Sequence, residues 1–428
     1  MHAAIVILVL VLTYLGMAAG RIAWLRVDRT GIALLAVIAL LASGEMTLDD
    51  FGSAVDMPTL ALLFAMMIIS AQLAESGFID LCANTIIQTR GGTAALLALT
   101  VAIGGALSAL LANDILIITI APLLIAGAQR RGFDPRPFAI ALAASTNAGS
   151  AATLIGSPQN ILLGAIGRLD FWTFLGVCGV PALFALFVVF GVVWLQWRGR
   201  MRDGTPPPET PSPIAATPAR AHVLDRNQTI KGGVAVAALL LLFATPLPRE
   251  IGALIIAALL LANRKITSRS MIATVDWPLL LLVSCLFAIT GQLNDSGIAA
   301  RVLFFLDDHQ LLPNNLLLLF PFATLTSNAI GSVPTAMLLL QIWPIPPPEV
   351  LYGLALSSTL AGNLLLNGSL TSLLIAEQAD RMGAGLTFRA YAQAGIPIAL
   401  LSLAFALSWL ALLNILPLLP PVPAVAAP

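Results

Sequence analysis

Residues 145–160 read Ser-Thr-Asn-Ala-Gly-Ser-Ala-Ala-Thr-Leu-Ile-Gly-Ser-Pro-Gln-Asn and interrupt an otherwise apolar segment, Phe138 to Ile166. Gly149, Gly156 and Pro158 disfavour a continuous helix there. Inside a membrane, such a break survives only where protein or a water-filled cavity satisfies the freed backbone groups. The stretch therefore predicts a membrane helix that breaks beside a polar site.

A second stretch has the same character. Residues 357–372 read Ser-Ser-Thr-Leu-Ala-Gly-Asn-Leu-Leu-Leu-Asn-Gly-Ser-Leu-Thr-Ser, and Asn367-Gly-Ser369 corresponds to Ile155-Gly-Ser157 at a spacing of 212 residues. Half-helix N-termini that meet near the middle of a membrane favour an anion, and carbonyls freed by the break can hold a cation. We expect the two broken helices to share one site.

Two further motifs repeat at a spacing of 220 residues. Val55-Asp-Met-Pro58 recurs as Val275-Asp-Trp-Pro278, and Gln72-Leu-Ala-Glu-Ser-Gly77 recurs as Gln292-Leu-Asn-Asp-Ser-Gly297. We expect two halves, each with three spans, a hairpin, a broken helix and a final span. Because each half then crosses the membrane five times, the second repeat is inverted relative to the first.

The composition places most of the chain in lipid. Of the 428 residues, 59% are hydrophobic and 10% are charged, and the mean hydropathy is +0.95, against roughly 45–50% apolar and about 25% charged residues in soluble domains. The formal net charge is zero, so we expect no nucleic-acid partner. The three histidines and three cysteines lie far apart, without metal-ligand or redox spacing. The chain is predicted to be an all-α polytopic membrane protein.

Apolar segments of sufficient length predict the spans. The uninterrupted spans are Ile5–Gly20, Ile32–Ser43, Pro58–Leu73, Phe171–Trp197, Gly233–Phe243, Ile251–Leu261, Pro278–Thr290 and Gly395–Leu416. The segments interrupted by polar and small residues are Ala94–Gln129, Phe138–Ile166, Leu316–Ile342 and Leu351–Ala376. We expect the function to reside in the interrupted segments.

A Pro-rich polar stretch separates the halves. We predict a first transmembrane repeat at 1–197, an exposed linker at 198–231, a second repeat at 232–416 and a Pro-rich tail at 417–428. The linker contains Thr205-Pro-Pro-Pro-Glu-Thr-Pro-Ser-Pro213, which cannot bury a core.

The basic residues orient the chain. If Ala94–Gln129 and Leu316–Ile342 are re-entrant hairpins and every other segment crosses once, 18 of the 21 Lys and Arg residues fall on one side and 3 on the other. The positive-inside rule then places the linker in the cytoplasm and the N-terminus outside. We expect a multi-pass protein of the bacterial cytoplasmic (inner) membrane, with the first hairpin open to the cytoplasm and the second to the outside.

The hairpins bring polar side chains to membrane depth, with turns expected at Ser108 to Asp114 and at Thr326 to Thr335. Asp114 is the one acid of 21 inside an apolar segment, and the others fall in loops, ten on each side. A carboxylate at that depth costs at least about 2.5–3.5 kcal/mol, so it should face a cavity and exchange protons. The alternative is a neutral, hydrogen-bonded acid that only holds the hairpin tip.

We predict that polar and small residues of the hairpins and broken helices line a solute and ion site. Its residues are Asn113, Asp114, Ser145, Asn147, Ser150, Gly156, Ser157, Asn160, Ser327, Asn328, Ser332, Thr335, Gly362, Asn363, Asn367, Gly368 and Ser369. A coupling sodium ion would lie near Asn113, Asn147 and Gly156, and no catalytic residue, cofactor or resident metal is expected. The alternative is that these serines and asparagines only cap half-helices.

These motifs resemble the ion transporter superfamily, in particular its arsenite-permease-like and citrate-transporter-like bacterial anion permeases. The resemblance rests on the following motifs: Ala112-Asn-Asp114, Asn147-Ala-Gly-Ser150, Ile155-Gly-Ser-Pro-Gln-Asn160, Val333-Pro-Thr335, Gly362-Asn363, Asn367-Gly-Ser369 and Ala376-Glu377. It implies two inverted repeats around a central site, and usually a homodimer that works by an elevator motion. Two positions depart from the pattern: Gly331-Ser332 stands where many relatives carry paired asparagines, and Ser372 where an asparagine often follows. Both changes remove candidate cation ligands and favour proton coupling over sodium coupling.

Two functions remain open from the sequence. The first is secondary active transport of a small anionic or neutral oxyacid solute, arsenite, antimonite or a carboxylate among them, coupled to H⁺ or Na⁺. The second is sodium/proton antiport with Asp114 as the titrating group. No GxxxxGK[ST] motif is present, so ATP-driven arsenite efflux would need a separate ATPase subunit. No Arg or Lys falls inside an apolar segment, which favours a neutral or singly charged solute.

Overall fold

The computed structural model describes residues 2–19, 27–199, 201, 224–245 and 247–418. This part of the chain is built from α-helices, with one short 3₁₀ helix, η2, at Leu366–Gly368. The helices long and apolar enough to cross a membrane are α4 (Met57–Glu75), α7 (Asn113–Arg130), α10 (Phe171–Trp197), α14 (Trp277–Asp295) and α20 (Phe388–Leu412). The predicted all-α class is confirmed.

The repeated motifs mark where the corresponding helices α4 and α14 begin and end. Asp56 and Asp276 precede the two helices, and each helix has a proline in its first turn, where the missing N–H costs nothing. Each ends before a glycine in the left-handed conformation, Gly77 at φ 77° and Gly297 at φ 67°, as helix C-termini commonly do. The sequence repeat is thus also a repeat of local structure.

The remaining unbroken helices fall into two groups. The apolar ones are α1 (His2–Ala19), α2 (Arg29–Ala42), α11 (Arg226–Phe243) and α12 (Arg249–Leu261). The short ones, expected as loops, are α3 (Leu48–Ala54), α5 (Phe78–Ile87), α13 (Ser268–Ala273) and α15 (Ile298–Asp308). One acid assigned to a loop, Asp80, is in fact buried within α5.

All four segments expected to be interrupted are broken in the structure. They form the pairs α6 (Thr93–Ser108) and α7, α8 (Arg136–Ser150) and α9 (Pro158–Ile166), α16 (Leu316–Ile330) and α17 (Ser332–Ile342), and α18 (Pro348–Ala361) and α19 (Leu370–Arg381). Helix α7 is itself long enough to cross a membrane, although the sequence placed it in a hairpin arm. The re-entrant course of the two hairpins stays a prediction.

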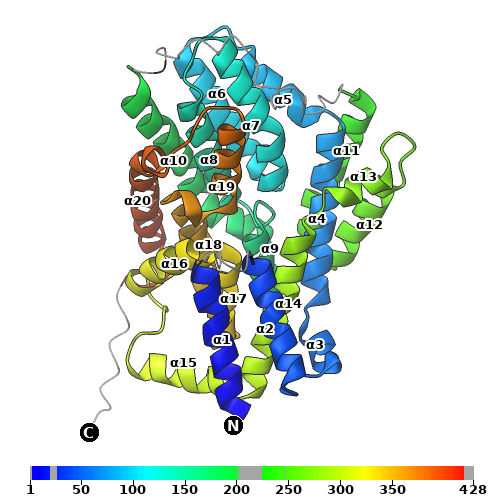
Figure 1. Ribbon diagram of the computed structural model, residues 1–428, viewed down its shortest axis with the longest axis vertical. Coiled ribbons are helices and arrows are strands. Elements are labelled where there is room, and N and C mark those ends of the chain that lie inside the picture. The colour runs from blue at the N-terminus through cyan, green and yellow to red at the C-terminus, as the bar shows by residue number, and fades with distance from the viewer. Residues whose placement is uncertain (1, 20–26, 200, 202–223, 246, 419–428) are drawn as a thin grey trace.

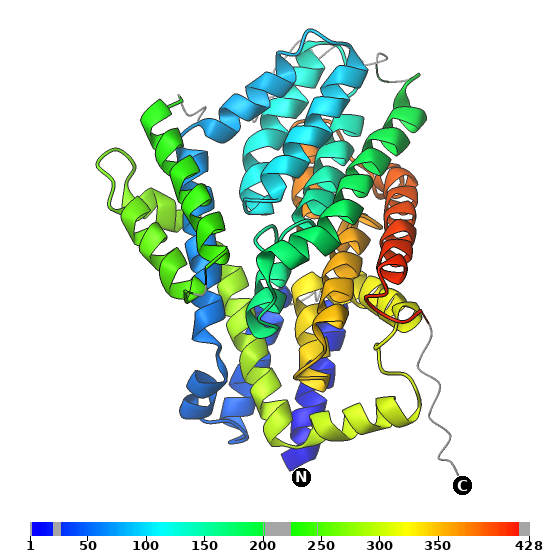
Figure 2. The same cartoon turned by 180° about the vertical axis from the view of Figure 1, so that it is seen from behind.

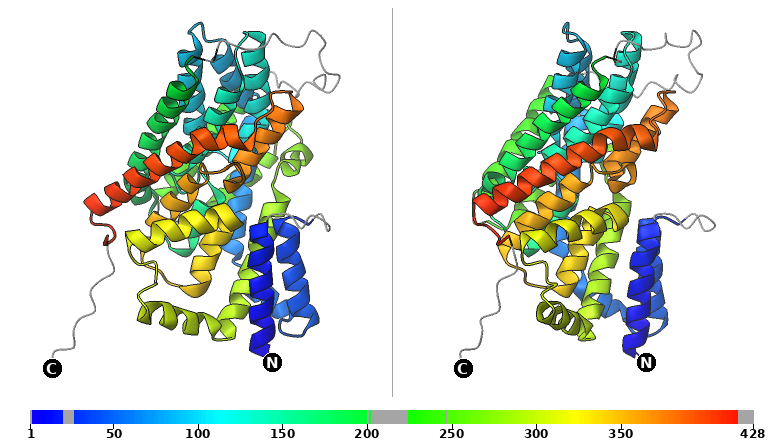
Figure 3. Two further views of the ribbon diagram at one scale, coloured as in Figure 1. Left: turned by 60° about the vertical axis from the view of Figure 1, so that its left-hand side comes forward. Right: turned by 90° about the vertical axis from the view of Figure 1, so that its left-hand side faces the viewer.

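The packing repeats along with the helix order. Helix α4 packs on α12 as α14 packs on α2, and α6 packs on α8 as α16 packs on α18. Helix α10 runs alongside its counterpart α20 (Figure 3), where the rings of Phe184 and Phe405 stack with centroids 3.8 Å apart. Figures 1 and 2 show α5 at one end of the longest axis and α15 at the other. This is the arrangement expected of two inverted halves, and their inversion relative to a bilayer stays a prediction.

Two helix ends lie near the predicted ends of the linker, and the division into two repeats stays a prediction. Helix α10 ends at Trp197, the predicted end of the first repeat, whereas α11 begins at Arg226, six residues before the predicted start of the second. Residues 226–231, assigned to the linker, are therefore helical. Most of the linker and nearly all of the tail lie outside the described residues.

Asp225 caps the N-terminus of α11. Its carboxylate accepts hydrogen bonds from the amides of Asn227 and Gln228 and pairs with Lys265 Nζ at 2.6 Å. The bond from Lys265 is the main reason that the pKa of Asp225 lies below its ordinary value. The pairing therefore stabilises the fold above the unfolded-state pKa, and this stabilisation is lost as the pH falls through the folded-state value.

We expect Asp225→Asn to lower the melting temperature at pH 7, and the difference from the parent to shrink as the pH falls below about 4. Fluorescence melts of the detergent-purified protein between pH 7 and pH 3.5 test this. Asp49→Asn, which removes an exposed acid on α3, serves as the control. A difference that does not change with pH would contradict the assignment.

Candidate functional site

Several helices begin at one cavity of about 160 Å³, which lies where the two halves meet. They are α7, α9, α17 and α19, the second members of the four broken pairs, and α14, whose N-cap Asp276 also lines the cavity. The lining residues are Met67, Ala112, Asn113, Asp114, Ile115, Asn147, Ser150, Ser157, Pro158, Gln159, Thr274, Asp276, Leu279, Ser332, Val333, Ser358, Thr359, Gly362, Gly368, Ser369, Leu370 and Thr371.

Helices α9 and α19 begin with matching caps. Ser157 at φ −147° accepts from the Asn160 amide at 3.3 Å, and Ser369 at φ −139° accepts from the Ser372 amide at 3.1 Å. A serine at this position satisfies one of the helix's unpaired amides. Both serines also line the cavity, so the capping and site-lining interpretations of these residues are compatible.

One amide ties the two broken helices together. Asn147 Nδ2 donates to Asn363 Oδ1 at 2.9 Å and to Ser369 Oγ at 3.0 Å, across the boundary between the halves. Asn363 in turn donates to the Ala144 carbonyl at 3.2 Å. This buried network holds the unwound stretch of one half against that of the other.

The tip of the first hairpin is held from three sides. The Ser108 hydroxyl lies within hydrogen-bonding distance of Asn113 Oδ1 and the Thr146 carbonyl, and the Ala112 amide donates to Ser70 Oγ at 3.0 Å. Helix α7 begins directly afterwards without a side-chain cap. This places Asp114, in its first turn, at the cavity wall.

The tip of the second hairpin is a single residue, Gly331, between α16 and α17. Its φ of 100° is in a region that favours glycine. The Thr335 hydroxyl donates to the Gly331 carbonyl at 2.8 Å, and Asn328 Nδ2 donates to the Ala361 carbonyl at 3.0 Å. Ser332, the first residue of α17, lines the cavity.

The structure brings about half of the predicted site residues to the cavity. These are Asn113, Asp114, Asn147, Ser150, Ser157, Ser332, Gly362, Gly368 and Ser369. The others lie behind the wall or away from it: Ser145, Gly156, Asn160, Ser327, Asn328, Thr335, Asn363 and Asn367. Asn160 is fully buried and donates to the Ser150 and Thr153 carbonyls, whereas Asn367 is exposed. Solute binding by the cavity residues stays a prediction.

The sequence interpretation missed a second carboxylate, that of Asp276, which lines the cavity with Asp114. Its own helix holds it, because it accepts from the Leu279 amide at 3.0 Å. The Val-Asp-Trp-Pro repeat had singled out this residue, and its apparent loop position concealed its role. Gln159, which also lines the cavity, donates from Nε2 across the halves to the hydroxyls of Ser358 and Thr359, two further lining residues.

The cavity wall contains groups that favour opposite charges. The positive dipole ends of the helices that begin at the cavity favour an anion, while the two carboxylates favour a proton or a cation. None of the described residues that line the cavity is an Arg or a Lys. This chemistry suits a small oxygen-rich solute together with a positive coupling ion, and binding of either stays a prediction.

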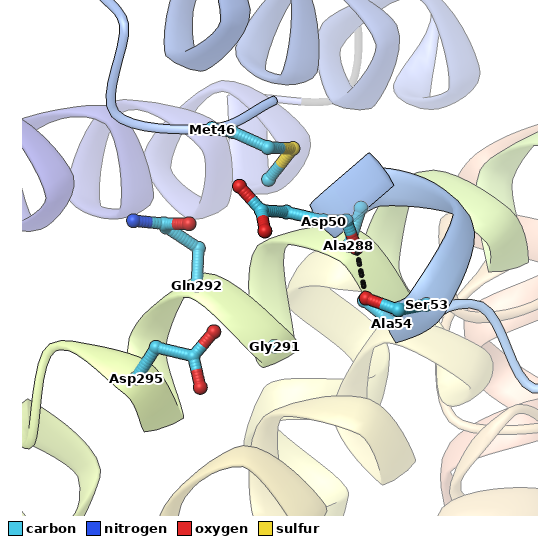
Figure 4. A pocket seen from close by; sticks show the side chains of 8 residues that line it. All are labelled: Met46, Asp50, Ser53, Ala54, Ala288, Gly291, Gln292 and Asp295. Atoms are coloured by element: carbon cyan, nitrogen blue, oxygen red, sulfur yellow. Dashed lines mark hydrogen bonds between the residues drawn. The ribbon is translucent and has the colours of Figure 1, made fainter. Parts of the chain in front are cut away.

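A second hollow, of about 190 Å³, lies between α3 and the end of α14 (Figure 4). It is lined by Met46, Asp50, Ser53, Ala54, Ala288, Gly291, Gln292 and Asp295. Asp50 already serves the capping box of α3, where it accepts from the Thr47 amide at 2.8 Å. Among the described residues no helix break opens onto this hollow, so the first cavity is the better candidate for the solute site.

The sequence matches a protein family and several curated proteins. A family model described as a citrate transporter matches residues 5–343. A 46 kDa membrane protein of Mycobacterium leprae is 26% identical over 94% of this chain and 96% of its own length. The silicon efflux transporter LSI3 of Oryza sativa subsp. japonica is 31% identical over 38% of this chain and 33% of its own. The family model and the silicon efflux transporter concern the transporter class that the motifs indicated.

Two solved transporter structures share the fold. The YdaH transporter of Alcanivorax borkumensis has a TM-score of 0.56 at 15% identity, covering 96% of both chains. MtrF of Neisseria gonorrhoeae, whose structure illuminated a class of antimetabolite efflux pumps, has a TM-score of 0.58 at 13% identity, covering 96% of this chain and 94% of its own. At these identities the likeness concerns the fold alone.

Proposed function

The chain belongs to the citrate transporter family, and from this premise we propose that it is a secondary active transporter of a small anion or oxyacid. Its family and its relatives are membrane proteins and transporters, not enzymes. The chain is likewise a multi-pass membrane transporter. The observation that carries the proposal is the convergence of the N-termini of α7, α9, α17 and α19 on one cavity.

The cavity chemistry favours a neutral or singly charged solute. Serine, threonine and asparagine side chains supply both donors and acceptors for an oxyacid, and helix N-termini stabilise partial negative charge. A dianion or trianion would be opposed by Asp114 and Asp276 unless a cation bound with it. Arsenite, antimonite and silicic acid fit these requirements, and a carboxylate fits them with a co-bound cation. If the chain exports arsenite, a separate ATPase subunit would supply energy from ATP hydrolysis.

We propose that protons couple to transport through Asp114. The carboxylate lies in the first turn of α7 at the cavity wall, and in apolar surroundings its charge is costly unless a proton or a cation compensates it. Sodium near Asn113, Asn147 and Gly156 is the alternative coupling ion. The alternative function, sodium/proton antiport without an oxyacid, would use the same carboxylate.

The working cycle that we propose is an elevator motion in a homodimer. The cavity lies where helices of both halves meet, so movement of the broken helices against α4 and α14 would carry a bound solute. We place the protein in a bacterial inner membrane, with its N-terminus outside and the linker in the cytoplasm, on the strength of the basic-residue distribution.

A counterflow screen in proteoliposomes tests the proposed function. Proteoliposomes that contain the protein are loaded with arsenite, antimonite, silicic acid, citrate or succinate. Exchange is then measured with and without sodium and with and without a pH gradient. Exchange of at least one of these solutes is the expected result. Sodium/proton exchange without exchange of any solute would instead establish the antiporter function.

Ser369→Ala tests the cavity assignment. This serine caps α19, accepts from Asn147 and lines the cavity, so its loss removes both a cap worth about 0.5–2 kcal/mol and a solute contact. We expect counterflow of the exchanged solute to fall about tenfold or more. Asn367→Ala is the matched control, because Asn367 lies two residues away but is exposed. Equal rates in the two variants would place the site elsewhere.

A further inference from the structure

We propose that Arg29 is a latch that holds the tip of the second hairpin, at Gly331, over the cavity. The inference rests on the proposed function only in that the latch controls access to its solute site. Arg29 is the first residue of α2, in a segment that the sequence assigned to a loop, and it is half-buried.

Two contacts place the guanidinium at the tip. Its Nη2 donates to the Ala329 carbonyl at 3.3 Å, and its Nη1 lies 3.0 Å from where a Cβ on Gly331 would stand. Ala329 is in the last turn of α16, where carbonyls have no partner within the helix and a cation is favourable. The Arg29 guanidinium thus lies beside Gly331, the residue that precedes Ser332, and Ser332 lines the cavity.

The latch is anchored on the other wall of the cavity. Thr30, the next residue, donates from its hydroxyl to the Pro278 carbonyl at 3.3 Å. Pro278 is in the first turn of α14, between Asp276 and Leu279, which line the cavity. Arg29 therefore bridges a packed helix pair, α2 and α14, to a tip whose one-residue break at Gly331 can act as a hinge.

The repeat supplies a matched control at the corresponding position. Arg249, exactly 220 residues later, is likewise the first residue of its helix, α12, and donates to a main-chain carbonyl, that of Leu169, at 2.7 Å. Its guanidinium also lies over the Phe243 ring. Leu169 follows the C-terminal end of α9, whereas the cavity lies at the other end of that helix, so a latch role belongs to Arg29 and not to Arg249.

Thiol labelling tests the latch without any solute. The reporter is Ser332→Cys in a Cys82→Ala, Cys285→Ala background that keeps the fully buried Cys178, and the probe is N-ethylmaleimide on the detergent-purified protein. Because the lost bond involves a charged donor, we expect Arg29→Gln to raise the initial labelling rate of the reporter on the order of tenfold. Arg249→Gln should leave that rate within about twofold of the parent, because the carbonyl that Arg249 bonds, that of Leu169, lies at the opposite end of α9 from the cavity.

Two results would overturn the proposal. One is equal labelling of the reporter in Arg29→Gln and Arg249→Gln. The other is labelling of Cys178 together with the reporter, because this would make Arg29 a residue required for the fold and not a latch. Since neither readout depends on the solute, failure of the counterflow screen would leave this test intact.

Discussion

We expect Asp114→Asn to abolish pH-driven transport and to leave the protein folded. The substitution keeps the size of the side chain and its place in the first turn of α7, but it removes the group that can take up and release a proton. Counterflow without a pH gradient should persist, because the caps and amides that line the rest of the cavity are unchanged. Accumulation driven by a pH gradient should fall to the level of empty liposomes.

The measurement compares uptake with and without an imposed pH gradient, in proteoliposomes of parent and variant. Glu349→Gln is the matched control, since Glu349 is also an acid in the first turn of a helix, α18, but is exposed and does not line the cavity. Undiminished gradient-driven uptake in Asp114→Asn would remove Asp114 from coupling and direct attention to Asp276.

Features set by local sequence could be predicted. Helix α10 matches its predicted bounds because 27 uncharged, mostly apolar residues lie between Asp170, which caps the helix, and Arg198. The break after α8 was predictable because Gly156 and Pro158 lie close together among short polar residues, a combination that disfavours a continuous helix. The short helices α3, α5, α13 and α15 were missed, because they are too short for a membrane span and their polar flanks resemble loops.

The cavity itself could be predicted only in part. Its wall depends on how the two halves pack, and no local pattern shows that Asp276 approaches Asp114 or that Arg29 reaches Gly331. Asn160 and Asn328 belong to the right segments, yet their amides bond to main-chain carbonyls of the unwound turns. The composition of a broken helix therefore indicates a site without telling which polar groups serve the solute and which serve the backbone.

We expect Gly149→Ala to be the most destabilising glycine-to-alanine substitution in the first half, because the added methyl group falls where α8 meets α6. A Cβ on Gly149 would stand 2.1 Å from the Gly105 carbonyl oxygen and 2.6 Å from Gly105 Cα. These are backbone atoms, which cannot rotate away, so α6 and α8 would have to separate. Small residues allow this kind of close approach between membrane helices.

The expected cost is at or above the upper end of the about 1–3 kcal/mol typical of overpacking. It should appear as a lower melting temperature and a lower yield of monodisperse protein. Gly191→Ala in α10 is the control, because a Cβ there meets nothing within 4 Å and alanine is the better helix former. A separation of α6 from α8 would also move Ser108 and Ser150, which flank the first tip. Any Gly149→Ala protein that still folds should therefore lose counterflow, and a variant with parental melting and transport would show that the two helices are not held by this contact.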